Sequence, residues 1–260
     1  VMLVEITNKA EHEMEITPVG VIPIYGRSAD NIRDHRHVTS LLHRIKTTEY
    51  GVEVTPTLSF DERCHQKNNI SYFVYGATGE EGKPQGFYPT VEDFIGEGGS
   101  FLIPEAVRTD KKVCLSGTEI QGKEAVGAIR FEKKTVKPGE TISYIMLAGL
   151  TDRDNDINKL TKKYRTAIAV KEELEAVKKQ WIDKVNISFE TGDSDVDNYL
   201  KWICFQPELR RIYGCSFLPH HDYGKGGRGW RDLWQDCLAL LIMDPTDVRR
   251  MIVNNYGGVR

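Results

Sequence analysis

The 260-residue sequence lacks the paired cysteines that mark a disulfide framework or a zinc site. Its five cysteines are an odd number with no CxxC pair, which favours reduced thiols that pack as small apolar residues. Basic residues do not outnumber acidic ones, and the net charge of −3 argues against a nucleic-acid-binding protein. The longest apolar run, at 238–243, is too short to span a bilayer, and the N-terminal residues do not read as a signal peptide. These absences predict a cytoplasmic globular protein with neither a nucleic acid nor a membrane as partner.

The first 150 residues carry the turn signals of a β domain. Glycine and proline clusters at 79–84, 96–99 and 137–139 separate short runs that are rich in β-branched and aromatic residues. Many short strands with such turns are typical of an antiparallel sandwich. The expected strands are 19–25, 52–60, 70–75, 112–116, 126–131 and 141–148.

One exception inside this region, and everything after about residue 154, has a helical period. Leu41, Leu42 and Ile45 predict a short helix over 39–49, and Leu174, Val177 and Trp181 predict one within 156–185. The expected later elements are a helix capped by Ser194 and disturbed by Pro207, a loop over 208–229, and helices over 232–243 and 245–254. The sequence therefore divides into a β-sandwich at 1–152, a helical linker at 153–186 and an unfinished all-α domain at 187–260.

Residues 223–236 concentrate groups that a hydrophobic core does not need. The stretch holds four glycines, three cations, two indoles, two carboxylates and an amide. Glycine lets the backbone approach a ligand, and a glycine-rich loop that leads into a helix N-terminus offers N–H groups to an anion. Arg228 and Arg231 are each suited to a bidentate grip on phosphate or carboxylate. The P-loop spacing GxxxxGK[ST] is absent, and no βαβ unit surrounds the loop, so neither nucleotide motif applies.

The polar residues that follow the loop suit a sugar. Asp232, Gln235 and Asp236 are three and four residues apart and share a helical face, and carboxylates with amides match hydroxyls that both donate and accept. Trp230 or Trp234 either stacks on the apolar face of a sugar or belongs to the core, and both readings stay open. The alternative for the whole segment is a capped helix start with one internal Arg–Asp pair, because the helix dipole favours acids there.

A second polar segment, residues 27–37 within the stretch 25–42, lies between an apolar strand and the expected short helix. Two hypotheses remain for it: an ion-pair network that braces the sandwich, or a loop that reaches a sugar site. The spacing of His35 and His37 is compatible with a metal, but no third ligand stands out, so no metal site is predicted. The secondary candidates for substrate contact are Arg27, Asp30, Arg33, His35 and His37, together with Tyr223 beside the glycine-rich loop.

These segments resemble the inverting disaccharide and oligosaccharide phosphorylases of glycoside hydrolase family 94, and among them the 1,2-β-oligoglucan phosphorylase group. The resemblance runs from about residue 18 to the end, with RDxxQD at 231–236 as its firmest part. It implies a β-sandwich, a helical linker and the first helices of an (α/α)6 barrel. By this likeness Arg231, Asp232 and Asp236 bind the hydroxyls of the transferred sugar, and Arg228 or Arg231 lies near phosphate.

The resemblance also implies an activity. A homodimeric enzyme is expected to convert a β-linked glucan, expected to be β-1,2-linked, into α-glucose 1-phosphate and a shortened glycan, with inorganic phosphate as co-substrate and no cofactor. Phosphorolysis needs a general acid but no general base, because phosphate is already an anionic nucleophile. In the family that acid lies downstream of RDxxQD, so we expect it beyond Arg260 and expect this chain to be an inactive fragment. The alternatives are a non-catalytic carbohydrate-binding or scaffold module, and the phosphorylase-like domain of a cyclic β-1,2-glucan synthase.

Overall fold

The structure, a computed structural model, describes residues 1–26, 39–60, 65–213 and 230–257. The chain forms two compact units, Val1–Glu172 and Glu173–Arg260, which we call the β unit and the helical unit and describe separately. No helix in these described segments is long and apolar enough to cross a membrane.

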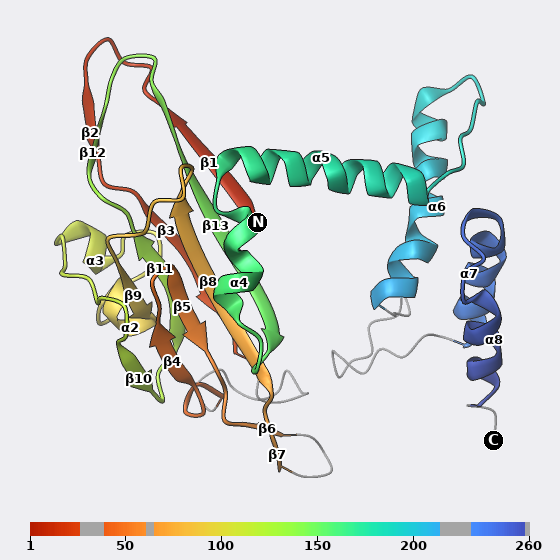
Figure 1. Cartoon of the computed structure of the whole chain (residues 1–260), viewed down its shortest axis with the longest axis horizontal. Helices are drawn as coiled ribbons and strands as arrows, with labels where there is room; N and C mark the ends of the chain where they lie inside the picture. Colours follow the sequence, from red (N-terminus) through yellow and green to blue (C-terminus); the bar gives the residue numbers. More distant parts are fainter. Residues whose placement is uncertain (27–38, 61–64, 214–229, 258–260) are drawn as a thin grey trace. The chain divides into compact units, whose positions relative to one another are not determined.

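The β unit is built from antiparallel sheets. A six-stranded sheet and a three-stranded sheet make up most of it (Figure 1), and two strand pairs extend it. The large sheet has the order β1 (Met2–Thr7), β13 (Thr141–Asp152), β8 (Ile70–Thr78), β5 (Gly51–Val54), β4 (Arg44–Thr47) and β10 (Glu119–Gln121). The small sheet has the order β3 (Val19–Ile24), β11 (Ala125–Arg130) and β9 (Gly86–Thr90). The strand pairs are β12 (Lys134–Val136) with β2 (Met14–Ile16), and β6 (Leu58–Phe60) with β7 (His65–Lys67).

The main core lies between the two sheets, and the alternation of side chains along each strand decides which residues enter it. On β5, Val52 and Val54 are fully buried in this core, whereas Glu53 between them faces the other side of the sheet. On β8, Val74 joins the same core and Tyr75 joins a second cluster on the opposite face. Burying each such aliphatic side chain contributes about 1.5–3 kcal/mol.

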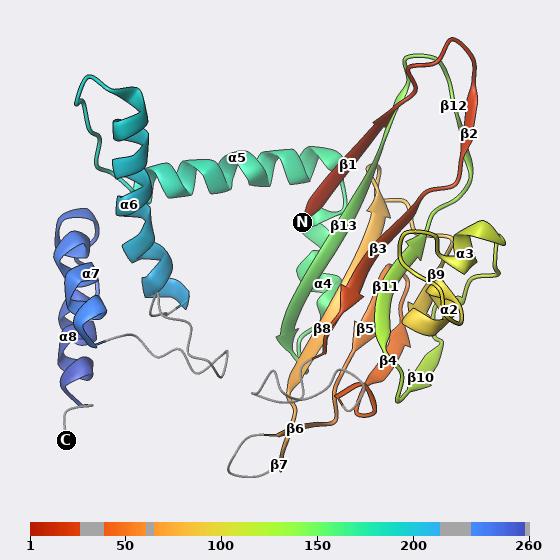
Figure 2. The same ribbon diagram turned by 180° about the vertical axis from the view of Figure 1, so that it is seen from behind.

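Both outer faces of this sandwich are partly covered. The second cluster, with Tyr75, Ile145 and Leu147, packs under α4 (Ile157–Thr161), which Figure 1 shows in front of β13 and β8, and under the 3-10 turn η1 (Lys162–Tyr164). On the opposite side, Tyr88 and Val126 pack with residues of α2 (Val91–Ile95) and α3 (Glu105–Arg108). Figure 2 shows these two helices from behind. The large sheet therefore carries apolar cover on part of its outer face only.

Two glycines allow the sheets to approach closely. A Cβ atom on Gly127 of β11 would lie 2.2 Å from Cβ of Val74, whereas a Cβ on Gly76 of β8 would lie 3.1 Å from flexible atoms of Ile129 and Phe131. We expect Gly127→Ala to lower the free energy of unfolding of the β unit by about 2 kcal/mol, because the clash is with a packed β-branched side chain. The matched variant Gly76→Ala should cost less than half as much. Thermal unfolding followed by circular dichroism measures both, and equal effects would contradict the sheet spacing seen here.

The structure corrects several of the expected elements. The helix expected over 39–49 is wrong beyond Ser40, because residues 41–42 form a turn and residues 44–47 form strand β4, with Ile45 and Thr47 buried and Lys46 exposed. The strand expected over 112–116 is wrong too, since only Cys114 makes a bridge, to Phe87. The run 52–60 is divided into β5 and β6, and proline at position 56 falls in the break between them.

The helical unit has its own core. It contains most of α5 (Ala167–Lys184), followed by α6 (Ser194–Tyr213), α7 (Trp230–Met243) and α8 (Val248–Tyr256). Leu233, Cys237 and Leu240 recur at helical spacing on the buried side of α7 and pack with residues of α6 and α8. The ring centroids of Trp181 and Phe205 lie 4.6 Å apart. The apolar stripe expected for α5 is mostly exposed, because Leu174 and Val177 remain open to solvent.

The ends of these helices differ from expectation for identifiable reasons. Asp193, not Ser194, caps α6, since its Oδ1 accepts a hydrogen bond from the backbone N–H of Asp195 at 2.9 Å. Pro207 lies inside α6, which continues to Tyr213, so the loop expected from 208 begins later. The last helix begins at Val248 after Asp247, whose φ of 62° places it in the left-handed region.

Candidate functional site

The RDxxQD residues lie on the first two turns of α7 and divide between two sides of that helix. Arg231 and Gln235 are exposed, Asp232 is half-buried, and Asp236 is buried. One turn of helix advances 3.6 residues, so Arg231 and Gln235 lie above one another, and so do Asp232 and Asp236. The single polar face that the sequence predicted is therefore divided in two. Asp232 and Asp236 lie on the side of α7 toward the interior, and Arg231 and Gln235 lie on the side toward solvent.

The solvent-facing side of the start of α7 borders a cavity of about 460 Å³ between α7 and α8. Arg231, Trp234 and Gln235 line it from α7, and Tyr256 lines it from α8. The rings of Trp234 and Tyr256 have centroids 5.4 Å apart. Trp234 also packs against the helical core, which is one of the two roles that the sequence left open for an indole here, and stacking on a sugar stays a prediction. The other lining residues, Cys237, Leu238, Leu241 and Ile252, are apolar, so the cavity is mainly apolar, with Arg231 and Gln235 as the polar side chains of α7 beside it. Such a wall suits the apolar face of a ring.

The acidic, interior side of α7 is connected to α6 by an ion pair. Asp236 accepts hydrogen bonds from Arg210, at 2.6 Å between Nε and Oδ2 and at 2.5 Å between Nη2 and Oδ1. This pair is bidentate, and both side chains are close to 10% exposed. Arg210 also donates to the side-chain oxygen of Gln206 at 3.2 Å. Asp236 is thus fixed in orientation by a partner that the motif does not contain.

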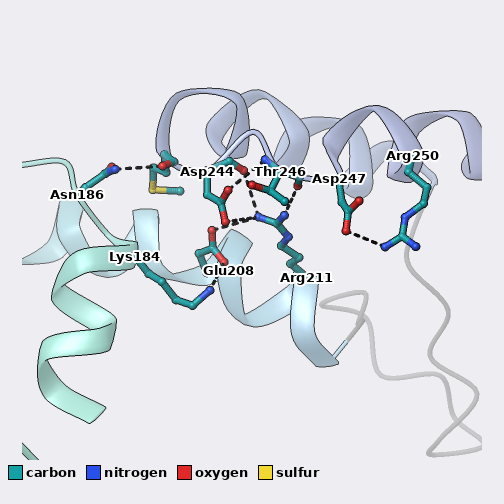
Figure 3. A network of polar contacts seen from close by, with 9 residues as sticks. Lys184, Asn186, Glu208, Arg211, Asp244, Thr246, Asp247 and Arg250 are labelled. Carbon is teal, nitrogen blue, oxygen red and sulfur yellow. Dashed lines mark hydrogen bonds and ion pairs between the residues drawn. The ribbon is translucent and has the colours of Figure 1, made fainter. Parts of the chain in front are cut away.

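A second polar network connects the end of α5 to α6 and to the α7–α8 junction (Figure 3). Glu208 is fully buried, and its carboxylate lies 3.6 Å from Lys184 Nζ and 3.6 Å from Arg211 Nη1. Arg211 donates to Asp244 Oδ2 at 3.0 Å and to the carbonyl oxygen of Thr246. Hydrogen bonds from Thr246, with a smaller contribution from Arg211, lower the pKa of Asp244. The network braces the helical unit close to a cavity of about 590 Å³ that Arg211 and Arg250 help to line.

Comparison with known proteins identifies the architecture. Residues 1–167 match the family model of the glycosyl hydrolase 94 supersandwich domain, which is more than half of the chain. The chain belongs to glycosyl hydrolase family 94. A curated relative, the cyclic β-(1,2)-glucan synthase NdvB of Rhizobium meliloti (strain 1021), is 27% identical over 178 residues. That match covers 67% of this chain and 6% of the relative, so the chain spans a small part of the relative's length.

Family 94 groups carbohydrate-active enzymes, and the predicted sandwich architecture is confirmed by the family match and by the sheets themselves. The matched stretch ends at residue 167, so it does not include the RDxxQD segment on α7. The roles suggested for that segment therefore depend on its own sequence and geometry. Among the residues that the structure describes, no three His, Cys, Asp or Glu side chains cluster as metal ligands would.

The predicted site residues of this family 94 chain are only partly described. Arg231, Asp232, Gln235 and Asp236 are placed as above, and Trp230 begins α7 without a described side chain. Outside the described residues lie Arg228, Tyr223, Arg27, Asp30, Arg33, His35 and His37.

Sequence reasoning missed the α6 residues that support this site, Gln206, Glu208, Arg210 and Arg211. Their spacing was a signal, because residues four apart predict the contact of Gln206 with Arg210, and residues three apart predict the charged pair of Glu208 with Arg211.

Proposed function

We propose that this chain is part of an inverting glycoside phosphorylase that uses inorganic phosphate to cleave a β-linked glucan. The products are α-glucose 1-phosphate and a glycan shortened by one unit. The proposal depends most on one observation: in a chain of family 94, the start of α7 presents Arg231 and Gln235 to a cavity that also holds Trp234. The β-1,2 linkage is supported by the similarity to a synthase whose name gives that linkage.

The roles follow from the chemistry of the step. A phosphate oxygen attacks the anomeric carbon, the glycosidic C–O bond breaks, and a general acid protonates the leaving oxygen. Arg231 pairs with phosphate or with hydroxyls of the transferred sugar, because its guanidinium is exposed at the cavity and always charged. Gln235, which lines the cavity, binds sugar hydroxyls, and Asp232 supports the helix start from the interior side. Asp236 is buried and held by Arg210 on the interior side of α7, so it positions this turn and does not contact the sugar itself.

We expect Arg231→Ala to reduce kcat/KM for phosphorolysis at least tenfold in a longer protein that contains this chain. Losing a hydrogen bond to a charged group costs about 1.5–3 kcal/mol, and each 1.36 kcal/mol is tenfold in rate. The measurement is release of glucose 1-phosphate from a β-1,2-linked gluco-oligosaccharide at several phosphate concentrations. Arg249→Ala on α8 is the matched control, because Arg249 is exposed and lines none of the cavities described above. Cleavage at the same rate without phosphate would rule the proposal out.

A second candidate is the phosphorylase-like domain of a cyclic β-1,2-glucan synthase, which the similarity to NdvB favours. The same assay separates the two. Cyclic products that form without consumption of phosphate support the synthase, and phosphate-dependent release of glucose 1-phosphate supports the phosphorylase.

A further inference from the structure

The outer face of the large sheet holds a cavity that the proposed reaction does not use. It has a volume of about 480 Å³, within the range of small-ligand pockets, and lies beside α4 over strands β4, β5 and β8. Its lining includes Lys46, Glu53, Tyr75, Arg153 and Asn158. All of these residues belong to the β unit, whereas the α7 cavity belongs to the helical unit.

The strand register places polar groups here for a simple reason. Val52 and Val54 turn into the main core, so Glu53 must point to the outer face, directly opposite Lys46 on β4. The hydroxyl of Tyr75 on β8 donates a hydrogen bond to Glu53 Oε1. Burial, helped by Glu53, raises the pKa of Tyr75, so this hydroxyl stays a hydrogen-bond donor at all ordinary pH values.

One buried arginine gives the cavity rigid walls. The guanidinium of Arg165 lies 3.7 Å from the ring centroid of Tyr50, and Tyr50 lines the cavity. The same guanidinium donates to the backbone oxygen of Asn158 at 2.9 Å and to Thr161 Oγ1 at 3.0 Å. Arg165 is only 4% exposed, so it holds the sheet side and the α4 side of the cavity together without facing a ligand itself.

The chemistry of the lining selects the class of ligand. Two cations and three carboxylates surround a larger number of hydroxyl, amide and phenol groups. A phosphate or another anion would meet the carboxylates, and the described carboxylates do not cluster as cation ligands. A neutral molecule with many hydroxyl groups satisfies both signs, because each hydroxyl can donate to a carboxylate and accept from Lys46 or Arg153.

We propose that this cavity is a second saccharide-binding site, which takes one or two sugar units of a glucan and holds the chain on the β unit. The choice of glucan rests on the proposed function, whereas the saccharide class follows from the lining alone. Such a site raises the local concentration of the polymer without taking part in bond cleavage.

The experiment measures saccharide binding to the 260-residue chain in an Arg231→Ala background, which weakens the α7 site. β-1,2-, β-1,3- and β-1,4-linked gluco-oligosaccharides are titrated by calorimetry. Glu53→Gln keeps an acceptor for Tyr75 but removes the charge, and Lys46→Met keeps the stem but removes the ammonium group. We expect each variant to bind at least tenfold more weakly than the background protein, since a charged hydrogen bond is lost. The matched control Lys134→Met, an exposed strand lysine outside the cavity, should bind normally.

The outcomes separate this site from the proposed function. Binding that Glu53→Gln and Lys46→Met weaken, in a longer protein that releases no glucose 1-phosphate, supports the second site and contradicts the phosphorylase. Absence of binding for every oligosaccharide, or equal affinity of Glu53→Gln and the background protein, overturns the second site. Thermal unfolding of each variant checks the fold, and Lys46→Met is the decisive variant if Glu53→Gln melts early, because Lys46 is exposed.

Discussion

Asp236→Ala should lower the free energy of unfolding of the helical unit by about 3–5 kcal/mol. The substitution leaves the guanidinium of Arg210, which is 12% exposed, without the carboxylate that binds it through two nitrogens. Removing one partner of a buried ion pair is strongly destabilising, because the other charge stays out of water uncompensated. All four tryptophans lie in the helical unit, at 181, 202, 230 and 234, so tryptophan fluorescence during urea unfolding reports on this unit alone.

Two variants make the experiment specific to the pair. Asp232→Ala, one turn earlier on α7 and only half-buried, should cost less than about 1 kcal/mol, the value of a charge near a helix N-terminus. Replacing both partners, Arg210→Met with Asp236→Leu, should recover most of the stability, since two apolar side chains need no compensation. If Asp236→Ala unfolds at the same urea concentration as the unsubstituted chain, the pair between α6 and α7 does not stabilise the unit.

The sandwich could be predicted because turn residues and alternation agree over much of the β unit. Val52, Glu53 and Val54 alternate as a half-buried strand does, and the structure follows that pattern. The pattern failed where apolar spacing is compatible with both periods, as at Leu41, Leu42 and Ile45. There Leu41 and Leu42 form a turn, and pairing of residues 44–47 with β5 and β10 places Ile45 in a strand. Strand β9 was missed because every residue in it is buried, so its sequence lacks the alternation of apolar and polar residues that marks a half-buried strand.

The candidate site could be predicted only where its residues are close in sequence. The run from Arg231 to Asp236 showed that a polar helix start follows the glycine-rich loop. It could not show that Asp236 pairs with Arg210, because the partner lies 26 residues away on another helix. For the same reason the cavity that places Arg231 beside Tyr256 of α8 could not be predicted, since it depends on how two helices pack.

Glu208 is a buried carboxylate whose ion pairs have poor geometry. No part of it is exposed, neither oxygen has a hydrogen bond among the described residues, and its two nearest cations are 3.6 Å away. Taking a charge out of water costs several kcal/mol. The attraction within ion pairs at this distance, without hydrogen bonds, offsets only a small part of that cost. Glu208 therefore occupies space in the helical core without stabilising it electrostatically.

Two substitutions at this position should consequently differ in a way that a stabilising ion pair would not produce. Glu208→Ala should lower the free energy of unfolding by about 3 kcal/mol, because it opens a cavity between α5, α6 and the α7–α8 junction. Glu208→Met fills nearly the same volume without a charge, and we expect it to be neutral or stabilising by up to about 1 kcal/mol. Lys184 is 31% exposed and can turn toward water, and Arg211 keeps its bonds to Asp244 and Thr246, so neither cation is stranded in the methionine variant. Urea unfolding followed by tryptophan fluorescence compares the two, and a loss in Glu208→Met as large as that in Glu208→Ala would mean that the carboxylate, and not its volume, stabilises the unit.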